Sequence, residues 1–429
     1  MSDKTLLMGL CFCGLLIIAL FTLNGGIALL ALPFLLYLGL GIWLSPSLET
    51  ISLSAERVVR KTIGDGVANV EVELILTNHG PETVCLLVND IPQGGMKIVK
   101  GTCYQRFLLE PGQEERHTYT FETRRGHFSW KNIETRVGDP LRVIETRLNL
   151  PAAAEIQVQP QLKKFKPFQL RPNSTLHSPG SIPARQGGSG TNFWGVREYQ
   201  PGDSQRWLEW RLTARHPGKL FTKEFEQEEI AEIGLVLDAR RRAEIKVNNE
   251  SLFECGVNAV ASLAEMFIRQ GHRVSLLVYQ DNPVRAYPDY GKLQLRRILN
   301  CLSQASTDSG NGSLNYLENL PVRLLPSHAL LLMVSPLTNN DWQLFPRLKS
   351  QGYQVVLVSP DPVHFANRNM VIKKDNTRMA LRAANIERQL IIRNILRLEI
   401  PVIDWKVDQP LSPLVKHALT RPVLSRRGW

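Results

Sequence analysis

Two long uncharged apolar segments at the N-terminus constrain this chain more than any other feature of its sequence. Residues 6–23 and residues 27–44 contain no charged side chain. As a helix, each segment would extend about 27 Å at roughly 1.5 Å per residue, and the hydrocarbon core of a bilayer is about 30 Å thick. Residues 24–26, Asn-Gly-Gly, suit a tight turn between antiparallel helices. The sequence therefore predicts a two-helix transmembrane hairpin over residues 1–48.

Two alternatives stay open for these segments. Because Lys4 precedes the first one, it also resembles a signal peptide, although a second apolar segment so close behind argues against cleavage. The pair would otherwise be a buried hairpin of a soluble protein. Lys4 lies on one flank, and Arg57, Arg60 and Lys61 follow the other. Since Lys and Arg collect on the cytoplasmic side of spans, we expect a multi-pass protein of the inner (cell) membrane with cytoplasmic soluble domains.

The charge and the cysteines agree with this placement. The formal net charge of +11 fits a body held near an anionic inner leaflet. The basic residues form no dense stripe, so we expect no nucleic-acid partner. The six cysteines show no CxxC pair and no disulfide-like spacing, which favours a reducing compartment. The histidines show no HExxH motif or zinc-like spacing, and the glycine-rich residues 187–190 lack the ending of a P-loop. We therefore expect no cofactor.

The middle of the chain changes pattern twice. Residues 49–160 carry short strand-like runs between turn clusters, with Val70, Val72, Leu74 and Leu76 on one face of a strand, which predicts a small all-β, sandwich-like domain. Four prolines interrupt the segment that follows, and residues 161–190 are interpreted as a linker.

Strand and helix patterns alternate after residue 230. Strands are expected at 233–237, 274–279, 329–334, 355–358 and 401–403, and helices at 250–270, 293–302, 341–351 and 379–398. Apolar strands bounded by helices predict a parallel sheet covered on both faces, so residues 231–410 are expected to form an α/β domain. The helix at 379–398 has an apolar and a basic face. This pattern suits a helix that packs on the core and exposes its basic face to water, and contact with the membrane is the alternative. Residues 411–429 are interpreted as a basic tail.

The segment at 191–230 concentrates aromatic and charged residues. Three of the eight tryptophans fall between 194 and 210, and both signs of charge interleave with them. One hypothesis is a recognition surface, because Trp, Tyr and Arg dominate binding hot spots. The alternative is a loop pinned against the sheet by Arg–carboxylate forks. Those forks would join Arg197, Arg206 or Arg211 to Asp203 or Glu209, with Trp194, Tyr199, Trp207 and Trp210 buried.

This segment also carries a long motif. Its residues are Gly195-Val196-Arg197-Glu198-Tyr199, Pro201-Gly202-Asp203, Arg206, Trp210, Ala214-Arg215 and Lys223-Glu224-Phe225-Glu226. With the flanking architecture, the chain resembles domain-of-unknown-function family 58. The resemblance implies two N-terminal spans, a β-rich segment and a von Willebrand factor A-like domain. It further implies a gene beside one for a MoxR-type AAA+ ATPase, a class thought to assemble or metallate other proteins. The family has no established enzymatic activity.

The sequence departs from the metal site that such a domain can carry. A von Willebrand A-like domain that binds Mg²⁺ has Asp-x-Ser-x-Ser after its first strand, because the hard cation needs oxygen ligands. Here Asp238 is followed by Arg240 and Arg242 at the hydroxyl positions, and a second acidic position is replaced by Ser335. Arginine cannot ligate a cation and adds repulsion, so we expect no bound metal. Residues 240–242 are instead hypothesised to contact an acidic partner or phospholipid.

Together these features predict a membrane-anchored adaptor or scaffold, and not an enzyme. Its expected partners are the lipid bilayer and, by resemblance, a MoxR-type AAA+ ATPase. The expected protein-docking residues are Arg197, Glu198, Tyr199, Asp203, Arg206, Trp210 and Arg215. One alternative is a hydrolase of cell-envelope material that uses Asp203 and Glu209 as acid and base. The other is a structural membrane protein that associates with its own kind.

Overall fold

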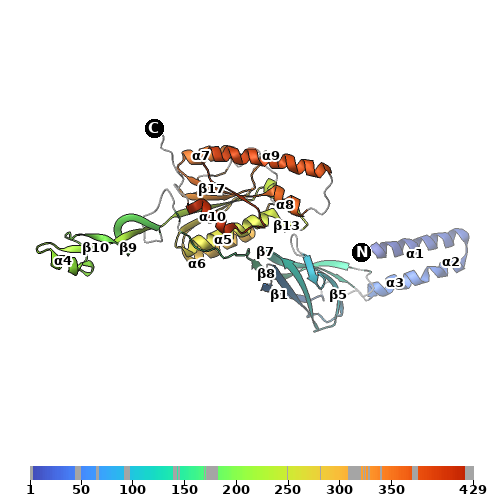
Figure 1. Cartoon of the computed structure of the whole chain (residues 1–429). Coiled ribbons are helices and arrows are strands. Elements are labelled where there is room, and N and C mark those ends of the chain that lie inside the picture. Colours follow the sequence, from blue (N-terminus) through green and yellow to red (C-terminus); the bar gives the residue numbers. More distant parts are fainter. Residues whose placement is uncertain are drawn as a thin grey trace. The chain divides into compact units, whose positions relative to one another are not determined.

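A computed structural model gives the structure of the chain as two compact units, Met1–Val158 and Gln159–Trp429 (Figure 1). The residues that it describes are 3–43, 50–63, 67–90, 97–138, 143, 145–168, 170, 182–248, 250–280, 282–307, 320–321, 323, 325–326, 329–338, 341–369 and 375–420. Two of the turn clusters that separate the strand-like runs of the predicted all-β domain, at 92–95 and 139–140, lie outside these residues.

The N-terminus is helical, but only its first helix is as long as predicted. Helix α1 (Asp3–Thr22) is followed by α2 (Gly25–Leu30) and α3 (Leu32–Trp43), and α1 and α3 lie side by side (Figure 1). The predicted second helix over 27–44 is thus interrupted, because Pro33 has no N–H to continue the hydrogen-bond ladder. Among the described residues, α1 alone is long and apolar enough to cross a bilayer, over Thr5–Thr22. Such a helix serves either as an anchor or as a signal sequence.

Antiparallel sheets form the rest of the first unit, as predicted. One described sheet has the order β1-β2-β6-β4 and the other has the order β5-β3-β7-β8. Side chains from both sheets share one core, and the predicted alternating residues of β2 are fully buried in it. The strands are β1 (Leu53–Ile63), β2 (Ala68–Asn78), β3 (Val84–Asn89), β4 (Lys97–Lys100), β5 (Tyr104–Leu109), β6 (Glu114–Thr123), β7 (Gly126–Gly138) and β8 (Glu145–Val158).

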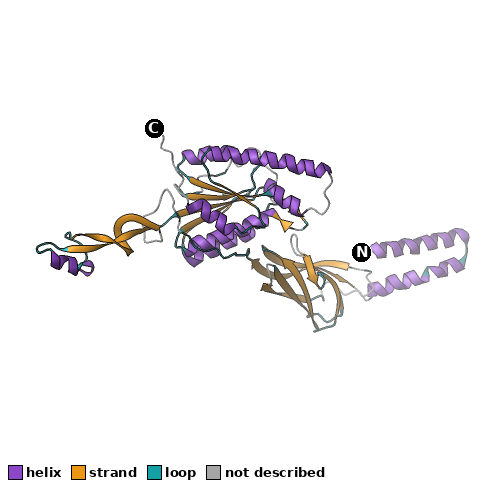
Figure 2. Ribbon diagram, viewed as in Figure 1, coloured by secondary structure: helices purple, strands orange, loops and turns teal. Residues whose placement is uncertain are grey.

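The second unit contains a mixed, mostly parallel sheet with the described strand order β15-β14-β11-β16-β17-β18 (Figure 2). Only β15 is antiparallel to its neighbour, and the sequence pattern did not predict it. The strands are β11 (Glu232–Asp238), β14 (Arg273–Tyr279), β15 (Val284–Asp289), β16 (Leu330–Val334), β17 (Gln354–Pro360) and β18 (Val402–Trp405). The short strands β12 (Lys246–Val247) and β13 (Glu250–Ser251) pair before the first helix.

Helices cover both faces of this sheet, as predicted. Helices α5 (Leu252–Arg269), α6 (Gly291–Gln304) and α10 (Leu411–Thr420) pack into the core on one face. On the other face, α7 (Leu344–Ser350) and α9 (Asp375–Arg397) build a second core. Helix α8 (Pro362–Asn369) follows β17 and was not predicted.

Two predicted boundaries are wrong. Residues 161–190, predicted to be a linker, contain the start of β9, which begins at Ile182. Phe168 and Leu170 of the same segment are buried in the core on the α5 face of the sheet. Pro183 is tolerated because β9 belongs to a two-stranded sheet. Residues 411–420 of the supposed tail form α10, where an i, i+4, i+8 row of apolar side chains faces the same core. Residues 171–181 and 421–429 lie outside the described part of the chain.

His272 gives the second unit a defined pH dependence. The residue lies between α5 and β14, its ring faces Phe267, and burial lowers its pKa to about 4. The unfolded chain, with a pKa of about 6.5, therefore takes up the proton first as the pH falls. We expect its contribution to stability to be complete above pH ~6.5 and to decline by about 3 kcal/mol towards pH ~4. Urea denaturation at several pH values should show this slope, and His272→Gln should flatten it; an equal slope in the variant would contradict the assignment.

Candidate functional site

The aromatic segment forms a hairpin rather than a loop against the large sheet. Strands β9 (Ile182–Glu198) and β10 (Phe221–Glu229) pair as a separate antiparallel sheet. The 3-10 helix η1 (Gln205–Trp207) and helix α4 (Trp210–Arg215) connect them (Figure 1). Residues 193–225, which include these two helices and the adjoining strand ends, are called the hairpin tip below.

An arginine–carboxylate fork fixes the turn that follows β9. Arg197 donates through Nη1 and Nη2 to the two carboxylate oxygens of Asp203, at 2.8 and 2.7 Å. The backbone N–H of Gln200 donates to the same carboxylate, and Gly202 has a φ of +111° that favours glycine. The hydrogen bond from Arg197 holds the pKa of Asp203 below its ordinary value. The predicted fork is therefore confirmed for this pair, and Glu224 lies 3.5 Å from the same guanidinium.

Two more ion pairs close the tip. Glu198 pairs with Lys219, and Glu209 with Lys223 at 3.0 Å. The hydrogen bond from Lys223 lowers the pKa of Glu209. A general acid at neutral pH needs a raised pKa, so the paired states of Asp203 and Glu209 argue against these two carboxyls as an acid–base couple.

Large apolar side chains of the tip face solvent. Trp210 is 66% exposed and Phe193 is 62% exposed, and Trp194, Trp207 and Leu220 are exposed as well. Tyr199 is only half-buried, and its N–H donates to the carbonyl of Leu220. The prediction that Trp194, Tyr199, Trp207 and Trp210 would be buried is therefore wrong, because a two-stranded sheet has no second layer to cover them.

The predicted docking residues divide into two groups. Arg197, Glu198 and Asp203 are engaged in ion pairs within the tip, and Tyr199 bonds through its backbone. Arg206, Trp210 and Arg215 are exposed. Sequence reasoning missed Phe193 and Leu220; the Phe-Trp pair beside Gly195 was the available signal for the first of them.

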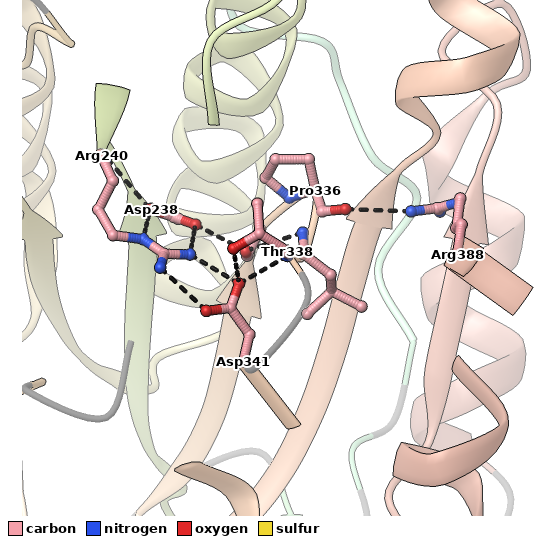
Figure 3. A network of polar contacts seen from close by, with 8 residues as sticks. Asp238, Arg240, Pro336, Thr338, Asp341 and Arg388 are labelled. Carbon is pink, nitrogen blue, oxygen red and sulfur yellow. Dashed lines mark hydrogen bonds and ion pairs between the residues drawn. The ribbon is translucent and has the colours of Figure 1, made fainter. Parts of the chain in front are cut away.

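A second cluster contains three of the four degenerate metal-site positions, all but Arg242 (Figure 3). It comprises Asp238, Arg240, Ser335, Thr338 and Asp341, and is called the Arg240 cluster below. Asp238 ends β11, Ser335 follows β16, and Asp341 opens the 3-10 helix η5 (Asp341–Gln343). The guanidinium of Arg240 donates to Asp238 at 2.8 and 2.7 Å and to Asp341 at 2.9 and 2.8 Å.

Arg240 is an internal group and not a surface charge. Arg240 is 4% exposed, and the two carboxylates that it pairs with are buried as well. Burial alone would lower the pKa of Arg240, but the hydrogen bonds and charges of Asp238 and Asp341 outweigh it and raise the pKa. The expectation that Arg240 brings only repulsion or reaches a partner is therefore wrong. Arg242 is exposed.

The cluster does not fit a metal ion as it stands. The guanidinium lies between the two carboxylates, where a cation would have to bind (Figure 3). Among the described residues, no group of three or more His, Cys, Asp and Glu side chains is arranged to hold a metal. Sequence reasoning missed Asp341, which lies 101 positions from Arg240.

Arg388 places a second guanidinium at the same edge of the sheet. From α9 it donates to the carbonyl of Pro336 at 3.1 Å, to the hydroxyl of Ser359 at 3.0 Å and to Asp404 at 2.6 Å. In open α/β sheets, ligands bind outside the carboxyl ends of the strands. Here the buried guanidinium groups of Arg240 and Arg388 lie at that edge, at the ends of β11, β16, β17 and β18.

Comparison with known proteins agrees with the sequence resemblance. Residues 195–380 match the family described as "Protein of unknown function DUF58". The chain is 27% identical over 246 residues to the uncharacterized protein YeaD of Bacillus subtilis (strain 168). That alignment covers 56% of this chain and 58% of the relative, so the chain spans less than two thirds of the relative's length.

Similarity to solved structures is weak. The putative ApaA protein of Bordetella pertussis is 14% identical, with a TM-score of 0.19 over 25% of this chain and 93% of its own. The FixG-related protein of Vibrio parahaemolyticus is 11% identical, with a TM-score of 0.17 over 24% of this chain and 94% of its own. The match to the DUF58 family of proteins of unknown function covers residues 195–380, which hold most of the hairpin tip and the whole Arg240 cluster, so this part of the chain is similar to that family.

Proposed function

We propose that this chain is a membrane-anchored adaptor or scaffold whose docking surface is the hairpin tip. The observation that carries the proposal is the exposure of Phe193, Trp194, Trp207, Trp210 and Leu220 on a two-stranded hairpin. An isolated two-stranded hairpin is marginally stable in water, and clustered exposed apolar side chains mark interaction sites.

The chemistry of the tip suits a protein partner. Burying a side chain such as Phe contributes about 1.5–3 kcal/mol, and Trp and Arg are enriched among binding hot spots. Trp210 and the exposed Arg206 and Arg215 lie on or beside the short helices of the tip. The internal ion pairs hold the turn in one conformation, which reduces the entropy lost on binding.

The proposed partner is a MoxR-type AAA+ ATPase or a client protein that it assembles, and this identity rests on the family resemblance. The α/β domain would be a von Willebrand A-like module that supports the hairpin. Its strands run in the doubly wound chain order 3-2-1-4-5-6, with helices on both faces, which supports this assignment.

The proposed anchor is a hairpin of α1 with α2 and α3 that crosses the bilayer twice. Its support is the exposure of apolar side chains along both arms, among them Leu20, Phe21 and Trp43, which water would solvate poorly. The β unit would be a sandwich-like domain that joins the anchor to the docking domain along the chain. We expect a reporter fused after residue 429 to be active in the cytoplasm; activity only outside the inner membrane would contradict this topology.

The docking proposal is tested by co-purification from detergent with a MoxR-type AAA+ ATPase, the partner that the family resemblance implies. Truncating hot-spot residues costs about 2 kcal/mol or more, so Phe193→Ala plus Trp210→Ala should weaken binding at least about 30-fold. Leu293→Ala is a matched control, because Leu293 on α6 is also 66% exposed. Arg197 is not substituted in this test, because its loss would remove the ion pair with Asp203 that fixes the turn itself. Equal recovery of the ATPase by the double variant and the control would refute docking through the tip.

A further inference from the structure

The oxygen atoms of the Arg240 cluster are arranged around a positive charge. All four carboxylate oxygens of Asp238 and Asp341 accept hydrogen bonds from one guanidinium (Figure 3). The hydroxyl of Ser335 donates to Asp238 at 2.7 Å, and that of Thr338 donates to Asp341 at 2.9 Å. Two carboxylates therefore surround a single buried cation, and each carboxylate also accepts a hydrogen bond from a hydroxyl.

The loop after β16 is bent to complete this arrangement. Leu337 has a φ of +62°, in the left-handed region that a leucine rarely adopts. This conformation accompanies a hydrogen bond from the N–H of Leu337 to the hydroxyl of Ser335 and one from the N–H of Thr338 to Asp341 at 2.7 Å. The backbone is thus fitted to Ser335, which bonds to Asp238, and to Asp341, which bonds to the guanidinium.

We infer that Arg240 is the permanent cation of this site, in the place that a divalent ion would take, and that it blocks a latent divalent-cation site formed by Asp238, Ser335, Thr338 and Asp341. Carboxylate and hydroxyl oxygens are the ligands that hard divalent cations prefer. The guanidinium satisfies both carboxylates through directed hydrogen bonds, and it excludes a second cation by occupying the space and by like charge.

The inference rests in part on the proposed von Willebrand A-like fold, and it deepens the proposed function. A guanidinium stays charged throughout the physiological pH range and cannot dissociate. The carboxyl edge of the sheet would then keep one arrangement whatever the concentration of divalent ions. A partner carboxylate could not bind there by completing the coordination of a metal, which leaves the hairpin tip as the docking surface.

The test measures Mn²⁺ binding to the full-length protein in detergent by electron paramagnetic resonance. We expect no saturable Mn²⁺ binding to the wild type, and no change in its thermal unfolding after dialysis against EDTA. Arg240→Ser should bind one Mn²⁺ per chain and unfold at a higher temperature with Mn²⁺ than without it. Arg240→Lys, which keeps a positive charge, should bind none.

The ligands are checked by adding Asp341→Asn to Arg240→Ser, which should abolish the gained binding. The neutral variant Arg240→Gln repeats the test in case the serine variant does not fold. The inference is overturned if the wild type binds Mn²⁺ in a manner that Asp341→Asn removes, or if a folded Arg240→Ser protein binds none. If Arg240→Ser and Arg240→Gln are both unfolded without metal, the inference is also overturned when added Mn²⁺ does not restore their folding. Loss of ATPase binding by the hairpin variants would leave these results unchanged, so the two proposals fail separately.

Discussion

Replacing Arg388 by alanine is expected to lower the free energy of unfolding of the second unit by about 3–5 kcal/mol, the range for breaking a buried charged network. The Arg388 side chain is 5% exposed, donates to the carbonyl of Pro336 and to both oxygen atoms of Ser359, and lies 3.6 Å from the buried carboxylate of Asp361. Truncation leaves these acceptors buried without their donor. Asp404 is partly exposed, so its ion pair contributes less than the buried hydrogen bonds do.

This loss is measured by pulse proteolysis in urea, with the fragments of the second unit followed separately, since the two units need not unfold together. Arg393→Ala is the matched control, because Arg393 lies on the same helix and is exposed. Its expected effect stays within about 0.5 kcal/mol, as for most surface substitutions. Equal effects of the two substitutions would show that Arg388 does not hold the strand ends together.

The strands of the large sheet were predictable where burial on both faces makes every residue apolar. Strand β16 is buried along its whole length, and β11 nearly so, which produces the short apolar runs that the sequence displays. Strand β15 was missed because it lies at an edge, where Arg285 and Tyr287 face solvent and Ala286 alone is buried. An edge strand of this composition has no periodic signal distinct from that of a loop.

The candidate site was predictable where its contacts are local. The fork between Arg197 and Asp203 joins residues six positions apart, and the motif that contains them indicated it. The pairing of Arg240 with Asp341 depends on the carboxyl ends of β11 and β16 meeting at one edge of the sheet. The sequence likewise contains no sign of whether a second layer covers an aromatic hairpin, so the exposure of Trp210 had to be observed.

Arg57 was interpreted from the sequence as a charge flanking the membrane, and the structure corrects this. Its side chain is fully buried in the β unit, where it pairs with Asp90 at 2.5 Å and donates to the carbonyl of Ala152. The hydroxyl of Tyr119 donates to the same carboxylate at 2.8 Å. Burial, followed by the charge of Asp90, raises the pKa of Tyr119, so its hydroxyl stays protonated and can act as this donor. Arg60 on the same strand is exposed instead.

Arg57→Ala is therefore expected to destabilise the β unit by about 3–5 kcal/mol, because it leaves Asp90 as an uncompensated buried charge. Arg60→Ala, three residues further along the same strand, should change stability by less than about 0.5 kcal/mol. The charge origin of the loss is tested with Arg57→Met combined with Asp90→Leu and Tyr119→Phe, which removes every partner of the network at similar volume. Replacing a buried ion pair by packed apolar groups is often neutral or stabilising, so the triple variant should be more stable than Arg57→Ala alone. If it were less stable, the packing of the arginine against Trp130, and not its charge, would account for the loss.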